Sequence, residues 1–161
     1  MSSSLTYSYF GKIDIKPNIL NKCLDLLNVE ETIPNTIPNE YKDYIPEQVG
    51  FYKTHVPTFF IPGIDIEKST FNVILQKPGR MLPWHIDKFD KHKEIHNTAK
   101  VRTYLCFLED WVPGQIFGTE LDTYTHWKAG DTICWDYLVW HFSSNASLKP
   151  KCTLQIQEGY D

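Results

Sequence analysis

The chain has 161 residues, of which 42% are hydrophobic and 14% aromatic, and its formal net charge at pH 7 is −4. This length predicts one domain with a sizeable core, and the scattered Lys and Arg residues form no basic stripe that would bind nucleic acid. No apolar run approaches the roughly 20 residues that cross a bilayer, and the first residues do not resemble a signal peptide. We therefore expect a soluble, cytoplasmic protein without nucleic acid or membrane partners.

The four cysteines, Cys23, Cys106, Cys134 and Cys152, form no CxxC pair, and three of them lie in apolar runs. This pattern predicts free, buried thiols in a reducing compartment.

The first 68 residues predict a flank of helix and wrapping loops. Residues 17–29 carry apolar side chains at helical spacing after Pro17, which favours the start of a helix. Pro34, Pro38 and Pro46 then exclude long regular structure, so we expect a loop with one short helical turn at residues 38–44.

Residues 69–158 change to short β-rich runs separated by turn signals such as "KPGR" (77–80), "VPGQ" (112–115) and "KAGD" (128–131). The expected strands are Thr70–Lys77, Met81–Asp87, Arg102–Glu109, Ile116–Leu121, Tyr124–Lys128, Asp131–Asp136, Val139–Ser143 and Lys151–Glu158. This number of strands predicts a mainly β, double-sheet jelly roll, with residues 1–161 forming a single domain.

The stretch "PWHIDKF" (83–89) places His85 and Asp87 two residues apart. Side chains at i and i+2 of a strand share a face about 7 Å apart, so both can approach one ion. Two polar residues on one strand face are also common without a metal. A second histidine from another strand would complete a facial triad of two histidines and one carboxylate, which leaves positions open on iron(II).

His141 in "LVWHFSSN" (138–145) is the candidate for that histidine, because an unpartnered imidazole is costly to bury in an apolar strand. Its structural alternative is a core histidine bonded to a backbone carbonyl. His92 and His96 in "DKHKEIHN" (90–97) raise a rival zinc reading, but the segment is polar and lacks an apolar stripe, so we expect a solvated loop.

Lys151 and Thr153 in "KPKCTLQIQ" (149–157) share one face of the last expected strand. A cation and a hydroxyl at this place can hold a carboxylate whose other end chelates a metal. A lysine at the start of a strand is otherwise usually solvated.

Three stretches resemble the iron(II)/2-oxoglutarate-dependent oxygenases of the double-stranded β-helix fold, a jelly roll of the cupin type. "GRMLPWHID" (79–87) is similar to the strand with the family's H-x-D, "VRTYLCFLED" (101–110) to a core strand, and "WHFSSNASLKPKCT" (140–153) to the distal histidine and basic residue. The match spans roughly residues 69–157. Within the family the chain resembles the prolyl hydroxylase and aspartyl/asparaginyl β-hydroxylase branches, although Trp84 separates Pro83 from His85 and the basic residue is Lys151 rather than Arg.

The resemblance implies that His85, Asp87 and His141 bind Fe(II), and that 2-oxoglutarate and O2 are cosubstrates. It further implies that Lys151 and Thr153 bind 2-oxoglutarate, with help from Arg102 or Tyr104. Two tryptophans neighbour ligands, Trp84 and Trp140, and strand alternation predicts that they face away and pack as structure. Residues 88–100 are expected to form a polar loop that covers the site.

The implied activity is hydroxylation of a C–H bond, favouring a prolyl or an aspartyl/asparaginyl residue of a peptide or protein, with release of succinate and CO2. Three alternatives stay open at this point. They are a hydroxylase of a free amino acid or other small molecule, a jelly-roll metal-binding protein that does not use 2-oxoglutarate, and a binding module without catalysis.

Overall fold

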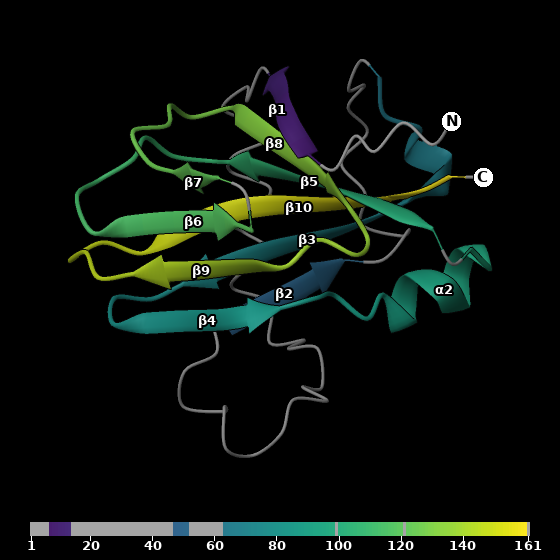
Figure 1. Cartoon of the computed structure of the whole chain (residues 1–161), viewed down its shortest axis with the longest axis horizontal. Helices are drawn as coiled ribbons and strands as arrows, with labels where there is room; N and C mark the ends of the chain where they lie inside the picture. Colours follow the sequence, from purple (N-terminus) through teal and green to yellow (C-terminus); the bar gives the residue numbers. More distant parts are fainter. Residues whose placement is uncertain (1–6, 14–46, 52–62, 99, 121, 161) are drawn as a thin grey trace.

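The computed structural model describes residues 7–13, 47–51, 63–98, 100–120 and 122–160. Two antiparallel sheets pack as a jelly roll, with strand orders β1-β8-β5-β10-β3-β2 and β4-β9-β6-β7 (Figure 1). The larger sheet contains β1 (Tyr7–Lys12), β2 (Glu47–Phe51), β3 (Ser69–Gln76), β5 (Val101–Phe107), β8 (Asp131–Asp136) and β10 (Lys151–Gly159). The smaller sheet contains β4 (Arg80–His85), β6 (Gln115–Thr119), β7 (Thr123–Tyr124) and β9 (His141–Asn145). The fold is therefore mainly β, a double-stranded β-helix, as the sequence predicts.

All eight expected strands are present, seven of them with shifted ends, and β1 and β2 lie in the flank where the sequence predicts only helix and loops. The run Asp131–Asp136 matches β8, whereas the expected strand Tyr124–Lys128 is reduced to β7, and His126 beyond it has a positive φ of 57° that extended chain does not adopt. The turn glycines Gly79 and Gly130 have φ of 78° and 91°, where a side chain would be strained. The helix expected over residues 17–29 and the turn at 38–44 lie outside the described residues.

Strand β10 lies between β3 and β5 and is paired with both along most of its length. Its side chains alternate between two environments, as strand geometry requires. Cys152, Leu154 and Ile156 enter a hydrophobic cluster on one face, and Lys151 and Thr153 face the space between the two sheets. The last strand thus links the core to the candidate site.

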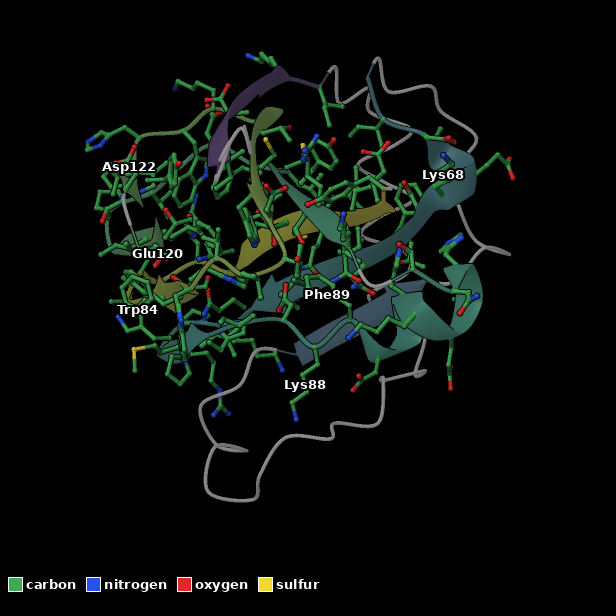
Figure 2. All side chains as sticks on the ribbon, turned by 45° about the vertical axis from the view of Figure 1, so that its right-hand side comes forward. Lys68, Trp84, Lys88, Phe89, Glu120 and Asp122 are labelled. Atoms are coloured by element: carbon green, nitrogen blue, oxygen red, sulfur yellow. The ribbon has the colours of Figure 1, made fainter. Side chains whose placement is uncertain are left out.

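Residues 90–96 form a helix, α2 (Asp90–His96), and not the solvated loop that the polar sequence predicts. Asn97 ends the helix with φ of 50°, and its N–H donates to the carbonyl of Lys93. The helix has no apolar stripe. Its inward-facing contact is made instead by His92, which is buried. Figure 2 shows Lys88 and Phe89 just before the helix, and Phe89 is buried. A short 3-10 helix, η3 (Ile66–Lys68), precedes β3.

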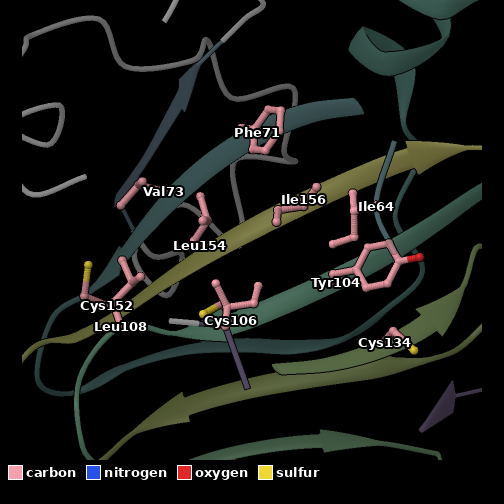
Figure 3. Close-up of a cluster of buried hydrophobic side chains, with 11 residues drawn as sticks. Ile64, Phe71, Val73, Tyr104, Cys106, Leu108, Cys134, Cys152, Leu154 and Ile156 are labelled. Carbon is pink, nitrogen blue, oxygen red and sulfur yellow. The ribbon is translucent and has the colours of Figure 1, made fainter. Parts of the chain in front are cut away.

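The larger sheet buries side chains on both faces. Figure 3 shows the cluster on the face away from the smaller sheet, to which β5 contributes Tyr104 and Cys106. The second cluster lies between the sheets and takes Leu105 and Phe107 from the same strand. The three described cysteines are buried in the first cluster, as expected. Within the described ranges no helix is long and apolar enough to span a membrane.

Candidate metal centre and its cavity

The three expected ligands converge at one end of the paired strands β4 and β9. His85 ends β4 and His141 begins β9, and the two residues are register partners whose ring centroids lie 4.2 Å apart. Asp87 lies just beyond β4 rather than within the expected strand Met81–Asp87. One strand pair therefore brings together residues that are far apart in the sequence.

The carboxylate of Asp87 faces both imidazoles through the same oxygen. Its Oδ1 lies 3.4 Å from Nε2 of His85 and 3.6 Å from Nε2 of His141. Each of the three residues offers one potential ligand atom, and these atoms lie within 4.8 Å of one another. The described part of the chain contains no other group of three or more His, Cys, Asp or Glu residues that could hold a metal ion. Two imidazole nitrogens and a carboxylate oxygen are a donor set suited to a first-row transition metal such as Fe(II).

Both histidines are oriented by the backbone. Nδ1 of His85 lies 2.7 Å from the carbonyl of Pro83, and Nδ1 of His141 lies 3.0 Å from the carbonyl of Val139. Because a carbonyl only accepts, each Nδ1 carries the proton, and the lone pair of a neutral ring is on Nε2, which faces Asp87. The rings are thus held in the tautomer that binds a cation through Nε2.

Charge interactions at the site favour the ionised carboxylate. Burial of Asp87 raises its pKa, but the charges and hydrogen bonds of His141 and His85 outweigh burial and hold the pKa well below its usual range. Burial lowers the pKa of His85, and the hydrogen bond and charge of Asp87, with the Pro83 carbonyl, reverse this and raise it. The site is therefore anionic at Asp87 at neutral pH.

A cavity of about 150 Å³, the volume of about five water molecules, extends from these ligands between the two sheets. Lys151 and Thr153 line it together with apolar side chains such as Leu105, Phe117 and Trp135. Five residues that were expected to bind the metal or the carboxylate of a ligand therefore line one cavity: His85, Asp87, His141, Lys151 and Thr153.

Lys151 is a buried cation without a carboxylate partner in the described part of the chain. Its Nζ donates to the carbonyls of Ile116 at 3.0 Å and Ser144 at 3.4 Å and to the hydroxyl of Ser143. Burial lowers its pKa to about 7. Since neutral oxygens alone offset little of the desolvation of a charge, the cavity is suited to an anionic group beside this ammonium.

Arg102 and Tyr104 do not reach the cavity, contrary to the expected role in holding a cosubstrate. Arg102 pairs with Asp136 at 3.3 Å, and the hydroxyl of Tyr104 donates to Glu158 at 2.8 Å. Leu105, which follows Tyr104 on β5 and points to the opposite face, lines the cavity instead. Alternation places Arg102 and Tyr104 on the same face, as predicted, but that face belongs to the other cluster.

The remaining histidines and the two tryptophans lie elsewhere. His92 and His96 approach each other on α2, with ring centroids 4.7 Å apart, but they belong to no metal-binding group among the described residues. His126 stacks on Trp111, and His55 lies outside the described residues. Trp84 and Trp140 do not line the cavity, as expected. They are 52% and 48% exposed, and the ring of Trp84 packs against that of Phe142 with centroids 4.6 Å apart.

Sequence reasoning missed the amides that line the cavity: Asn72, Gln76, Gln155 and Gln157. The signal for two of them was present, because Gln155 and Gln157 continue the alternation that begins with Lys151 and Thr153. Gln76 binds the smaller sheet, donating to the carbonyl of Ser143 at 3.1 Å and accepting from its hydroxyl at 2.9 Å.

No protein-family model and no curated protein matches the chain. Among solved structures, a prolyl-4-hydroxylase from Pseudomonas putida aligns over 96% of this chain and 93% of its own, with a TM-score of 0.64 and 12% identity. The structure of EvdMO1 aligns over 96% of this chain and 47% of its own, with a TM-score of 0.60 and 15% identity. The cupin domain of Schizosaccharomyces pombe Cnp3 aligns over 71% of this chain and 65% of its own, with a TM-score of 0.47 and 8% identity. At these identities the first two alignments concern the fold alone, which is the two-sheet jelly roll described above.

Proposed function

We propose that this protein is an Fe(II)- and 2-oxoglutarate-dependent dioxygenase that hydroxylates a C–H bond of a prolyl or an aspartyl/asparaginyl residue in a peptide or protein. One observation carries the proposal: a group of two histidines and one carboxylate shares a cavity with a buried lysine that has no carboxylate partner in the described residues. The first element suits a metal and the second suits an anion, so the cavity fits a ligand that bridges them.

Two groups of cavity residues would bind different parts of the ligands. Nε2 of His85, Nε2 of His141 and a carboxylate oxygen of Asp87 would hold Fe(II) on one side. Lys151 and the hydroxyl of Thr153 would bind the distal carboxylate of 2-oxoglutarate on the other. When bound, iron with 2-oxoglutarate and O2 supplies the oxidising chemistry that yields succinate, CO2 and the hydroxylated product.

The protein side of this activity is orientation and exclusion of water. Leu105, Phe117 and Trp135 form the apolar part of the lining, and the amides Asn72, Gln76, Gln155 and Gln157 form part of its polar lining. The attraction between the ammonium of Lys151 and an anion is stronger in this cavity than in water, because the surroundings screen the charges less. The carbonyl bonds to His85 and His141 fix the ligand rings before a metal arrives.

Anaerobic titration of the apoprotein with Fe(II) and then 2-oxoglutarate tests the proposal. We expect the weak visible charge-transfer absorption of an iron chelate, which needs both additions, and its loss in His141→Ala. His126→Ala, a change at an exposed histidine outside the cavity, is the matched control and should leave the band in place. Absence of the band in the unaltered protein would refute the proposal.

Substrate class is tested separately with peptide libraries that contain proline, aspartate or asparagine. The expected result is the gain of one oxygen atom in a peptide, detected by mass spectrometry, together with succinate release in a stoichiometric amount. Release of succinate with hydroxylation of a free amino acid, and of no peptide, would move the proposal to the small-molecule alternative.

A further inference from the structure

The two oxygens of Asp87 lie in different surroundings. Oδ1 faces the two ligand histidines, and Oδ2 accepts a hydrogen bond from Nε2 of Gln155 at 3.4 Å. Gln155 lies on β10 and is almost fully buried. One oxygen is therefore directed at the metal position and the other at the wall of the larger sheet.

The charge of Asp87 fixes which atom of the Gln155 amide faces it. An ionised carboxylate only accepts hydrogen bonds, so the amide must present its NH2 group to Oδ2. Its carbonyl oxygen, Oε1, then points the other way and accepts from Nδ2 of Asn72 at 3.1 Å and from Nε2 of Gln157 at 3.4 Å. The orientation of the Gln155 side chain is thus set from both ends.

The same logic extends the hydrogen bonds to helix α2. With its NH2 group used on Gln155, Gln157 accepts through Oε1 from the hydroxyl of Thr70 at 3.4 Å. The Thr70 oxygen, having donated its proton, accepts from Nδ1 of His92 at 3.0 Å. Nε2 of His92 is then left without a proton. This agrees with its surroundings, because that atom is buried and has no hydrogen-bond partner within the described ranges.

Backbone pairing holds this line of side chains in place. In the register of β3 with β10, Asn72 lies opposite Gln155 and Thr70 lies opposite Gln157. Thr70, Gln155 and Gln157 are all at most 9% exposed, which limits the competition of bulk water for these bonds. The line therefore starts at His92 and runs through Thr70, Gln157 and Gln155 to the second oxygen of Asp87.

We propose that Gln155 is a positioning residue which, held by this line from His92, keeps Oδ2 of Asp87 away from the metal, so that the carboxylate binds through Oδ1 alone. The inference rests on the metal site of the proposed function. A carboxylate that turned to bind through both oxygens would fill a position that the facial triad leaves open for other ligands. The line thereby preserves a metal position without touching the metal.

The number of water molecules on bound Mn(II), measured by pulsed electron–nuclear double resonance, tests the proposal without 2-oxoglutarate or turnover. Gln155→Met keeps the size of the side chain but removes the donor to Oδ2. We expect one fewer metal-bound water in this variant than in the unaltered protein. Thr70→Val breaks the line at a distance from Asp87, and we expect a change in the same direction in a fraction of the molecules.

Gln115→Met is the matched control, because Gln115 is a buried glutamine on β6 that contacts Ser147 and the carbonyls of Lys149 and Pro150 rather than the cavity. Its water count should equal that of the unaltered protein. An unchanged count in Gln155→Met would overturn the inference and leave the metal site intact. An unchanged count in Thr70→Val would overturn the role of the line. Failure of the unaltered protein to bind Mn(II) would overturn the proposed function itself.

Discussion

The ammonium group of Lys151, on β10 of the larger sheet, donates a hydrogen bond to the hydroxyl of Ser143, on β9 of the smaller sheet. This bond crosses the space between the sheets beside the cavity, and it holds the charge at a fixed place among neutral oxygens. The ammonium is in this way prepared for an anion that the described part of the chain does not supply.

Lys151→Met is expected to weaken 2-oxoglutarate binding about 10- to 100-fold, the range for a lost hydrogen bond to a charged group. Metal affinity should not change, because the hydrogen bonds of Lys151 go to Ile116, Ser143 and Ser144 and not to the three ligands. The unfolding temperature should stay the same or rise, since the change removes a desolvated charge. Isothermal titration of the metal-loaded protein measures the affinity. Lys149→Met, at an exposed lysine two residues earlier, should bind normally.

The affinity for 2-oxoglutarate should depend on pH through the same side chain. Burial lowers the pKa of Lys151 to about 7 in the free protein, so the ammonium is lost as the pH rises through 7. We expect the dissociation constant to rise from pH 6 to pH 8.5 in the unaltered protein. In Lys151→Met it should stay flat over that range. A flat profile in both proteins would contradict the assignment of Lys151.

Asp87→Asn is expected to lower the pKa of His85 in the apoprotein. The pKa is raised at present because the hydrogen bond and charge of Asp87 outweigh burial, and the neutral amide would leave burial to dominate. NMR titration of the imidazole signals measures the change. An increase or no change in the His85 pKa would show that Asp87 does not interact with it as the 3.4 Å separation indicates.

His92 should make the protein less stable in mild acid. Burial and the charge of His96 lower its pKa to about 4 from an ordinary value of 6.5, so between these values the unfolded chain takes up a proton that the folded chain does not. The free energy of unfolding therefore falls as the pH drops from 6.5 to 4. Thermal unfolding across this range measures the slope, which should flatten in His92→Gln and persist in the control His126→Gln.

The sequence predicted the strands and the metal group for a common reason, which is that both follow from alternation along a strand. His85 and Asp87 share a strand face by alternation, and His141 could be matched with them because an unpartnered imidazole is costly to bury in an apolar strand. Alternation could not decide which face Arg102 and Tyr104 occupy, because β5 is buried on both faces and its pattern looks the same from either side. Only pairing with β10 and β8 settles it.

The helix α2 was missed for a different reason. Residues 90–96 carry no apolar stripe, and the helix is stabilised by tertiary contacts of His92 and His96, whose partners Thr70 and Ser69 lie on β3. Gln155 and Gln157 were passed over because amides are not metal ligands, although their positions were predictable. In both cases the sequence does not show which residues of other elements these side chains contact.

Strand β10 also decides how readily this protein could acquire a new specificity. Lys151, Thr153, Gln155 and Gln157 face the cavity, and the residues between them belong to the core. Substitutions at Lys151 and Thr153 can therefore reshape the cavity without disturbing the packing behind the sheet. A deletion of a single residue at the start of the strand would exchange the two sets and lose both at once. Redesign of the proposed activity can therefore use substitutions in β10, but insertions and deletions in this strand should be avoided.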